Sequence, residues 1–123
     1  MTKFEIIFYE KENGECPVEI FLLSLDKKMR VKITGILEIL EEKGNSLREP
    51  YSKHIDDGIF EIRCKVGSNI SRILYFFYYG EKIIMTNGFI KKSPKTPIRQ
   101  IKTAKKFRAD YMRRIENENI KTV

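Results

Sequence analysis

Residues 60–97, FEIRCKVGSNISRILYFFYYGEKIIMTNGFIKKSPKTP, decide the fold of this 123-residue chain. Three runs rich in β-branched and aromatic residues are separated by short segments that contain glycine, a pattern typical of consecutive β-strands joined by hairpin turns. Arginine interrupts the first two runs, at Arg63 and Arg72, and a pair of lysines ends the third. A sheet built only for stability would hold neutral residues at the two arginine positions, so a functional reason for them has to be considered.

The first turn sets the register of the two arginine-containing strands. If Gly67 and Ser68 form a two-residue turn, Arg63 lies directly opposite Arg72, and both side chains project from one face, which we call the arginine face. A three-residue loop that also includes Asn69, without a bulge, is the alternative. It would send Arg72 to the opposite face.

The second turn places the third strand. A two-residue turn at Gly80 and Glu81 pairs Arg72 with Phe89. The same register adds Met85, Asn87 and Lys91 to the arginine face. The other face, which the helices are expected to cover, carries Phe60, Ile62, Cys64, Ile73, Tyr75, Phe77 and Ile84.

Like charges opposite each other in a sheet destabilise it, by up to about 1 kcal/mol, so removing Arg63 or Arg72 should not reduce stability. One explanation is a surface ion network in which Glu61, on the same face, neutralises the arginines. The other is a phosphate site, because a guanidinium group presents its donors in a planar fork that matches phosphate oxygens. The cations expected on or just beyond this face are Arg63, Arg72, Lys91, Lys92 and Lys95.

The segment before residue 60 predicts one strand and two helices. KFEIIFYE, residues 3–10, alternates as a first strand does, and a short helix begins near Pro17. A second helix follows over residues 27–44, with Asp26 as its N-cap and Gly44 as its C-terminal stop. Gly35 within it costs about 1 kcal/mol relative to Ala, so we expect close packing or a slight kink there.

Two further signals complete the predicted order of elements. Asp57 and Gly58 predict a hairpin turn that leads into the sheet. A C-terminal helix is predicted from about Pro97 to Glu116, with Thr96 as a possible N-cap.

Composition limits the partners of the protein. The chain carries 24 Lys and Arg against 17 Asp and Glu, a formal charge of +7, which favours a polyanion and nucleic acid first of all, although a merely solvated basic surface is the alternative. We expect one globular domain over residues 1–123, located in the cytoplasm, because the two cysteines suit neither a disulfide scaffold nor a CxxC motif. No signal peptide or membrane span is expected.

Four segments in this order resemble one known family. The segments LREPYSKHIDDGIFEIR, SRILYFF, GFIKKSPKTP and AKKFRADY, with the order β-α-α-β-β-β-α, resemble the RelE superfamily of toxin-antitoxin toxins, and its HigB and phage-derived HigB-like branch in particular. The resemblance implies a small α+β domain with a mainly antiparallel twisted sheet, two N-terminal helices and one C-terminal helix. It also implies an RNase that cuts messenger RNA at the ribosome and is inhibited by a HigA-like helix-turn-helix antitoxin.

The resemblance implies catalysis by basic side chains. A ribonuclease of this kind uses the 2′-hydroxyl of the RNA as nucleophile, and Arg63 and Arg72 would stabilise the charge of the transition state. Lys91 or Lys92 would orient the phosphate or protonate the departing 5′-oxygen. Lys53 and His54 occupy positions where family members often carry basic catalytic residues, and which group is the acid or the base stays open. From the turn at residues 57–58, His54 should lie opposite Glu61 on the arginine face, with Lys53 pointing the other way.

Other interpretations remain. No metal site and no cofactor are expected, because no His, Cys or carboxylate cluster has ligand spacing. A basic RNA-binding domain without activity, or a module that binds a nucleotide or a phosphoprotein, would share the charge. The aromatic residues Phe76, Tyr78 and Phe89 either stack on bases or belong to the core. In the C-terminal helix, Lys102, Lys105, Lys106 and Arg108 would dock on ribosomal RNA, contact the antitoxin, or simply be solvated.

Overall fold

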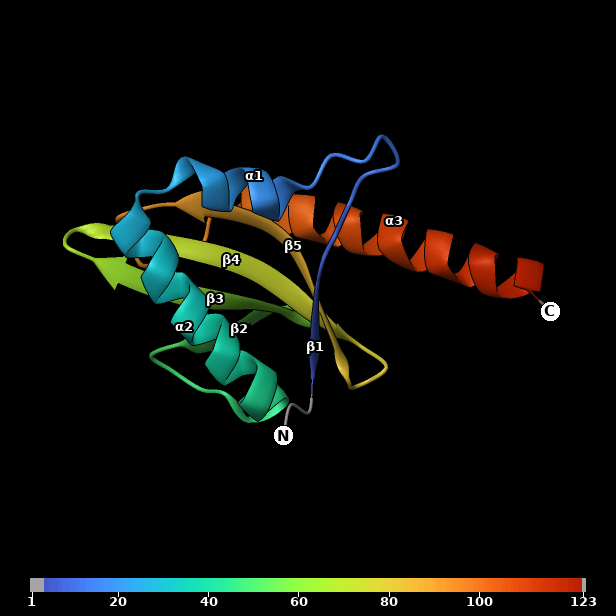
Figure 1. Cartoon of the computed structure of the whole chain (residues 1–123), viewed down its shortest axis with the longest axis horizontal. Helices are drawn as coiled ribbons and strands as arrows, with labels where there is room; N and C mark the ends of the chain where they lie inside the picture. Colours follow the sequence, from blue (N-terminus) through green and yellow to red (C-terminus); the bar gives the residue numbers. More distant parts are fainter. Residues whose placement is uncertain (1–3, 123) are drawn as a thin grey trace.

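A five-stranded mixed sheet with helices on both faces forms the protein (Figure 1). The computed structural model describes residues 4–122 of the chain. The elements in chain order are β1 (Glu5–Phe8), α1 (Pro17–Ser24), α2 (Lys27–Lys43), the 3-10 helix η1 (Gly44–Ser46), β2 (Ser52–Asp56), β3 (Ile59–Val66), β4 (Asn69–Tyr78), β5 (Lys82–Ile90) and α3 (Ile98–Thr122). The α+β class is confirmed. The order contains one strand more than predicted, because the segment before the Asp57 turn is itself a strand.

The strands lie in the order β1-β5-β4-β3-β2, with β1 parallel to β5 and all other pairs antiparallel. The β3–β4 turn consists of two residues, and its first residue, Gly67, has φ 62°, which favours glycine. The predicted pairing of Arg63 with Arg72 is confirmed, as is that of Arg72 with Phe89. A three-residue first turn is therefore excluded.

The β4–β5 hairpin differs from the prediction in two places, at its turn and at a bulge in β5. Its turn has three residues, since Tyr78 pairs with Lys82, and a register shift follows between Leu74 and Tyr75. Tyr75 pairs with Met85 and Leu74 with Asn87, so Thr86 is the extra residue of a bulge. The longer turn and the bulge cancel before Arg72. Between them the faces are exchanged: Met85 packs with the α1 and α2 core and Ile84 with the α3 core, the reverse of what was predicted.

A second bulge lies in β2. Lys53 pairs with Glu61 and His54 with Phe60, after a register shift at Ile55. Lys53 is therefore on the arginine face and His54 on the opposite face. The predicted orientation of both residues is wrong, because the bulge inserts one residue between them and the turn.

Local sequence explains the limits of α2. The Asp26 carboxylate accepts a hydrogen bond from the Met29 amide at 2.9 Å, as an N-cap does, and Gly44 ends the helix at φ 52°. Gly35 is exposed, and a methyl group added there would meet open space, so the expectation of close packing is wrong. Gly88 of β5 is different, because the Phe21 ring of α1 lies directly over its backbone and leaves no room for a Cβ.

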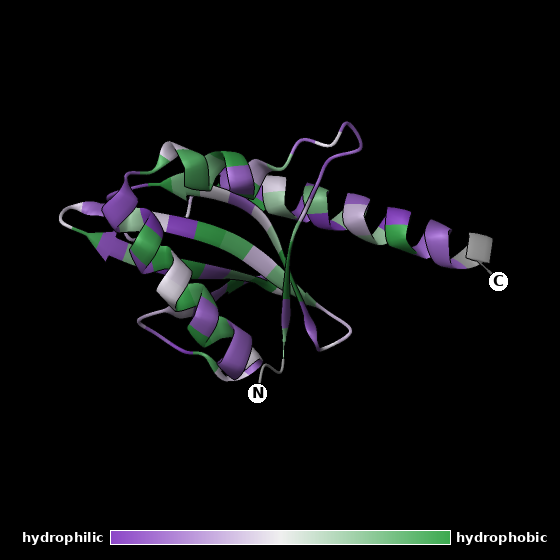
Figure 2. Cartoon of the chain, viewed as in Figure 1, coloured by the Kyte–Doolittle hydropathy of each residue, from purple (hydrophilic) through white to green (hydrophobic). Residues whose placement is uncertain are grey.

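The sheet buries apolar side chains on both of its faces. Figure 2 shows that hydrophobic residues are frequent along its central strands. Helices α1 and α2 cover one face, and α3 covers part of the arginine face, which was expected to be open. Phe76 and Tyr78 pack against Tyr111 of α3, so they belong to the core and offer no stacking surface. Cys64 is buried in the α1 and α2 core, as predicted. Within residues 4–122, no helix combines the length and the apolar character needed to span a bilayer.

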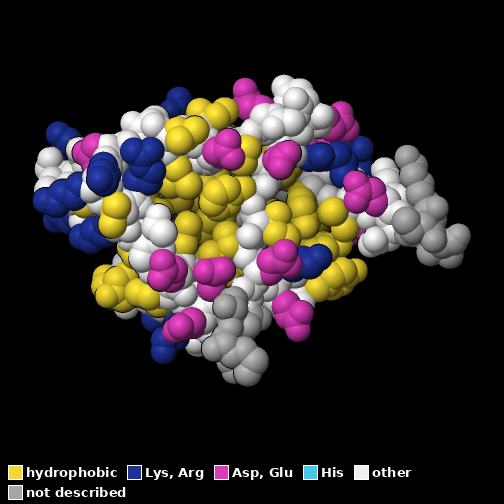
Figure 3. All heavy atoms as spheres, viewed as in Figure 1, with side chains coloured by type: hydrophobic (Ala, Val, Ile, Leu, Met, Phe, Trp, Pro, Cys, Tyr) yellow, Lys and Arg dark blue, Asp and Glu magenta, His cyan; other side chains and the backbone are white. Residues whose placement is uncertain are grey.

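Charge is divided unevenly between two segments of the chain, which we call the negative layer (residues 5–46) and the positive or basic layer (residues 47–122). Residues 5–46, which form β1, α1, α2 and η1, contain six Lys and Arg against nine Asp and Glu, whereas residues 47–122 contain seventeen against eight. Figure 3 shows the first layer, with an apolar patch between α1, α2 and β1 and acidic side chains around it. The same view shows basic side chains gathered at the end where the β3–β4 turn lies. The positive charge of the protein therefore resides in the strands β2 to β5, their loops and α3.

Candidate functional site

A buried carboxylate is the centre of the arginine face. Glu61 of β3 is completely buried and accepts hydrogen bonds from Arg63 Nε at 2.5 Å and from the Thr96 hydroxyl at 2.6 Å. The Arg72 guanidinium lies 3.8 Å from Oε2 of Glu61, the oxygen that also accepts from Thr96. One negative charge thus faces two positive charges, which removes most of the repulsion expected between the paired arginines.

Arg72 is the most enclosed member of this cluster. Its side chain is fully buried, and its two terminal nitrogens donate to the backbone carbonyls of Ser93 and Pro94, the latter at 3.2 Å. Burial lowers the pKa of Arg72, while Glu61 acts in the opposite direction. Within the described chain its Nε has no hydrogen-bond partner. Arg72 therefore does not line an open face, and in this arrangement its donors are directed at the protein itself.

Arg63 is the arginine of the pair that reaches solvent. A quarter of its side chain is exposed, and it also donates to the Pro94 carbonyl. The ion network with Glu61, one of the two explanations considered for the arginines, is present. It is a buried network that leaves one edge of Arg63 accessible, so it does not exclude a phosphate site at Arg63.

The segment between β5 and α3 is held by this cluster. Arg72 donates to the carbonyls of Ser93 and Pro94, Arg63 donates to that of Pro94, and the Lys91 amide donates to the Ile70 carbonyl at 3.0 Å. The side chains of the same segment that project into solvent are Lys91, Lys92 and Lys95, which we call the lysine loop. Thr96 was expected to cap the helix, but α3 begins at Ile98 and the Thr96 hydroxyl donates to Glu61 instead.

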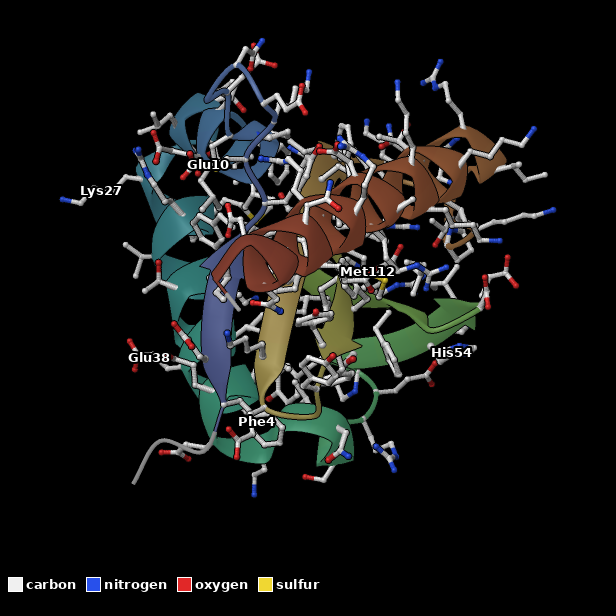
Figure 4. All side chains as sticks on the ribbon, turned by 90° about the vertical axis from the view of Figure 1, so that its right-hand side faces the viewer. Phe4, Glu10, Lys27, Glu38, His54 and Met112 are labelled. Atoms are coloured by element: carbon white, nitrogen blue, oxygen red, sulfur yellow. The ribbon has the colours of Figure 1, made fainter. Side chains whose placement is uncertain are left out.

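Strand β2 brings one of its two predicted residues to this site. Lys53, half exposed and directly opposite Glu61, shares the face of Arg63. His54 lies on the other face, where its ring packs edge-on against Phe60 at 5.1 Å and its Nε2 accepts the Gly58 amide at 3.1 Å. In Figure 4 it is at the side of the molecule opposite to Glu38 of α2.

A cleft of about 440 Å³ adjoins β2. Its lining includes Arg48, Lys53, His54 and Phe60. Arg48 was not among the predicted site residues, although it stands in the LREP segment that begins the family-like motif. Lys53 and His54 lie on opposite faces of β2, the edge strand, and both line this cleft. His54 is therefore close to the site although it is on the other face of the sheet.

The basic residues of α3 fall into two groups. Lys105 forms an ion pair with Asp56 at 2.7 Å, and Arg108 binds the Asp57 carboxylate at 3.0 Å and its carbonyl. Lys105 holds the pKa of Asp56 below its ordinary value. These two residues attach α3 to the β2–β3 turn.

The other group faces solvent. Lys102 and Lys106 are exposed and line a shallow depression together with Arg99 and Thr103. Of the four α3 residues predicted to contact RNA, only these two present free cationic groups.

In its next turns, over residues 110–114, α3 is fixed to the chain that follows β1. The Tyr9 hydroxyl donates to Asp110 at 2.5 Å, and Arg113 and Arg114 bind the same carboxylate at 2.7 and 2.9 Å. Burial, followed by the contact with Asp110, raises the pKa of Tyr9 to about 12. This contact is structural, and it keeps α3 on the sheet.

The accessible chemistry of the arginine face is that of cations. Arg63 and Lys53 lie beside the buried Glu61, and the two arginines hold the backbone of the lysine loop next to them, an arrangement that suits a phosphate group. No set of three or more His, Cys, Asp or Glu side chains within residues 4–122 is placed to hold a metal ion.

Comparison with known proteins identifies the family. No curated protein matches the chain. The family described as phage derived protein Gp49-like (DUF891) matches residues 20–109, which is well over half of the chain and includes the ion cluster, the lysine loop and the first half of α3. The chain therefore belongs to the Gp49-like family of phage-derived proteins, a family of the RelE toxin type.

Proposed function

We propose that this protein is the toxin of a type II toxin-antitoxin system, of the HigB-like branch, and that it is an endoribonuclease that cleaves messenger RNA at the ribosome in the cytoplasm. The observation that carries the proposal is the accessible edge of Arg63 beside the lysine loop. The buried cluster around Glu61 fixes Arg63 and the backbone of the lysine loop. Arg63 and the lysine loop lie in the basic layer of a protein that belongs to a family of toxin type. Preorganised cations of this kind stabilise charge that develops in a transition state.

The reaction needs no group beyond the RNA and the protein. The 2′-hydroxyl oxygen attacks the adjacent phosphorus, its proton passes to a base, and the bond to the 5′-oxygen breaks as that oxygen receives a proton. The products are a 2′,3′-cyclic phosphate and a 5′-hydroxyl. Arg63 stabilises the added negative charge, and Lys91 or Lys92 orients the phosphate or protonates the leaving oxygen.

The remaining predicted residues receive different roles. Lys53 shares the face of Arg63, so it is the candidate in β2 for proton transfer, and His54 is a secondary candidate through the adjoining cleft. Arg72 is buried, and we assign it to positioning because it holds the carbonyls of the lysine loop.

The partners follow from the family and from the charge. A toxin of this type has an antitoxin, here proposed to be a HigA-like helix-turn-helix protein encoded with it. Lys95, Lys102 and Lys106 would contact ribosomal RNA, since lysines position nucleic acid through its phosphates. Lys105 and Arg108, which were expected to do the same, are engaged with the β2–β3 turn.

The test is expression without an antitoxin, together with cleavage by the purified protein. Expression should arrest growth, and Arg63→Ala should relieve the arrest while circular dichroism stays unchanged. With ribosomes and messenger RNA, mapping of 5′ ends should locate discrete cuts. Full toxicity of a well-expressed Arg63→Ala variant would refute the assignment of Arg63.

The chemistry of the ends tests the mechanism. Cleavage of free RNA should persist in EDTA, and the upstream fragment should end in a 2′,3′-cyclic phosphate or its 3′-phosphate hydrolysis product. A 3′-hydroxyl on that fragment would contradict attack by the 2′-hydroxyl.

A second candidate is an RNA-binding domain without activity. The burial of Arg72 favours it, because only one of the two paired arginines can meet a phosphate directly. The same experiment separates the candidates, since this domain would bind RNA and ribosomes but leave the RNA intact.

A further inference from the structure

A second groove, lined in part by Arg63, lies close to the Gly67 turn. It has a volume of about 330 Å³ and lies between α2, the chain just before β2, and the ends of β3 and β4 that meet at the Gly67 turn. Its lining residues are Lys32, Ile36, Pro50, Tyr51, Arg63, Cys64, Lys65 and Ile70.

The lining of this groove combines an apolar interior with cations. Ile36 and Cys64 are buried core residues, whereas Tyr51 leaves 42% of its surface exposed. Lys65 is exposed, and the Lys32 ammonium donates to the Lys65 carbonyl at 2.5 Å. None of the eight lining residues is acidic. A flat aromatic ring beside an apolar surface, with cations at the rim, matches a nucleotide, whose base is flat and whose phosphate is anionic.

The backbone connects this groove to the candidate catalytic arginine. The Arg63 amide donates to the Tyr51 carbonyl at 2.9 Å, and the Tyr51 amide donates to the Arg48 carbonyl at 3.1 Å. Tyr51 and Arg63 are thus attached to each other through their main chains. A base placed against Tyr51 would therefore be held close to Arg63.

We propose that this groove binds one nucleotide of single-stranded RNA, next to the phosphate at Arg63. The base lies against Tyr51, and Lys65 with Lys32 meets the backbone phosphate. This proposal rests on the proposed function, and it adds a position at which the RNA is held by stacking as well as by charge. Stacking on an aromatic side chain accepts every base, so the groove fixes the position of the strand more than its sequence.

A tryptophan reporter tests the groove directly. The chain contains no tryptophan, so Tyr51→Trp introduces a single indole. Titration with a 2′-O-methyl hexaribonucleotide, which cannot be cleaved by 2′-hydroxyl attack, should quench its fluorescence. The matched control is Tyr79→Trp, since Tyr79 is 82% exposed in the β4–β5 turn, at the opposite end of β4 from the Gly67 turn. Its emission should not change.

Affinity measurements give a second, independent readout. Fluorescence anisotropy with a labelled hexamer should show binding about 10- to 100-fold weaker for Tyr51→Ala, and within about threefold of wild type for Tyr51→Phe, because stacking needs the ring and not the hydroxyl. The mononucleotides AMP and UMP should bind far more weakly than the hexamer. Equal affinity for them would overturn RNA as the ligand in favour of a free nucleotide.

Two results separate failure of this proposal from failure of the proposed function. If the hexamer binds but neither quenches Tyr51→Trp nor discriminates Tyr51→Ala, the groove proposal is wrong, while RNA cleavage at Arg63 can still be tested by product mapping. If the hexamer does not bind the wild-type protein at low salt, the groove is refuted as an RNA site whatever the outcome on ribosomes.

Discussion

Replacement of Arg72 by Met tests the central role of the ion cluster in stability. The variant loses two hydrogen bonds to backbone carbonyls and an ion pair 3.8 Å from Glu61, all in a fully buried site. Removal of one partner of a buried ion pair costs about 3–5 kcal/mol. Because Glu61 keeps its bonds to Arg63 and Thr96, we expect the lower end, a loss of about 3 kcal/mol in the free energy of unfolding. This reverses the expectation, made from the sequence, that either arginine could be removed without loss of stability.

Urea unfolding followed by circular dichroism measures this loss of free energy, and thermal unfolding measures the corresponding shift of the Tm. For a chain of this length 1 kcal/mol shifts the Tm by about 4 °C, so Arg72→Met should melt about 12 °C below wild type. The matched control is Arg63→Met, which should cost about 1 kcal/mol because that side chain is partly solvated. Equal losses for the two variants, or an Arg72→Met variant within about 0.5 kcal/mol of wild type, would refute this account of the cluster.

Three further predictions concern the helices. Gly35→Ala should raise the free energy of unfolding by about 0.5–1 kcal/mol in urea unfolding, because the position is exposed and a methyl group meets open space. Gly44→Ala should lower the free energy of unfolding, because its φ is 52° and the Phe4 ring occupies the space, and the opposite order of the two variants would contradict this. The pKa of Asp110 lies below its ordinary value because a tyrosine hydroxyl donates to it, with two arginines adding to the effect, so its stabilisation is present above about pH 4 and is lost as the pH falls through the lower folded-state pKa. Acid unfolding curves should therefore be flatter for Asp110→Asn, and a slope equal to that of wild type would disprove the linkage. Lys102→Glu combined with Lys106→Glu should weaken ribosome binding and reduce the log-log salt slope by about two units, and unchanged binding would remove this helix from the RNA footprint.

Hairpin geometry correctly predicted that the two arginines pair, but the register that it predicted was wrong wherever a strand contains a bulge. A two-residue glycine turn predicts Arg63 opposite Arg72, and the structure selects this turn over the three-residue alternative. The bulge at Thr86 has no comparable signal. Helices cover both faces of the sheet, so Ile84 and Met85 are both buried although they point in opposite directions. Where both faces are apolar, alternation no longer tells one face from the other.

The burial of Arg72 could not be predicted for a different reason. Residue types predict that cations gather on one face, and Glu61 is the counterion considered for them. The enclosure of Arg72, however, is produced by carbonyls of Ser93 and Pro94, more than 20 residues away along the chain. A backbone acceptor leaves no trace in the side-chain pattern, so sequence reasoning finds the charges and misses the groups that enclose them.

The uneven division of charge between the two layers gives the molecule an electrostatic direction. A body with a net positive layer and a net negative layer experiences a torque near a polyanion, so it turns its positive layer towards the polyanion before contact, and such steering raises association rates steeply at low salt. The acidic and apolar surface between α1, α2 and β1 is then turned outward. A partner that binds this surface would therefore not compete for the same side chains with a polyanion bound to the positive layer.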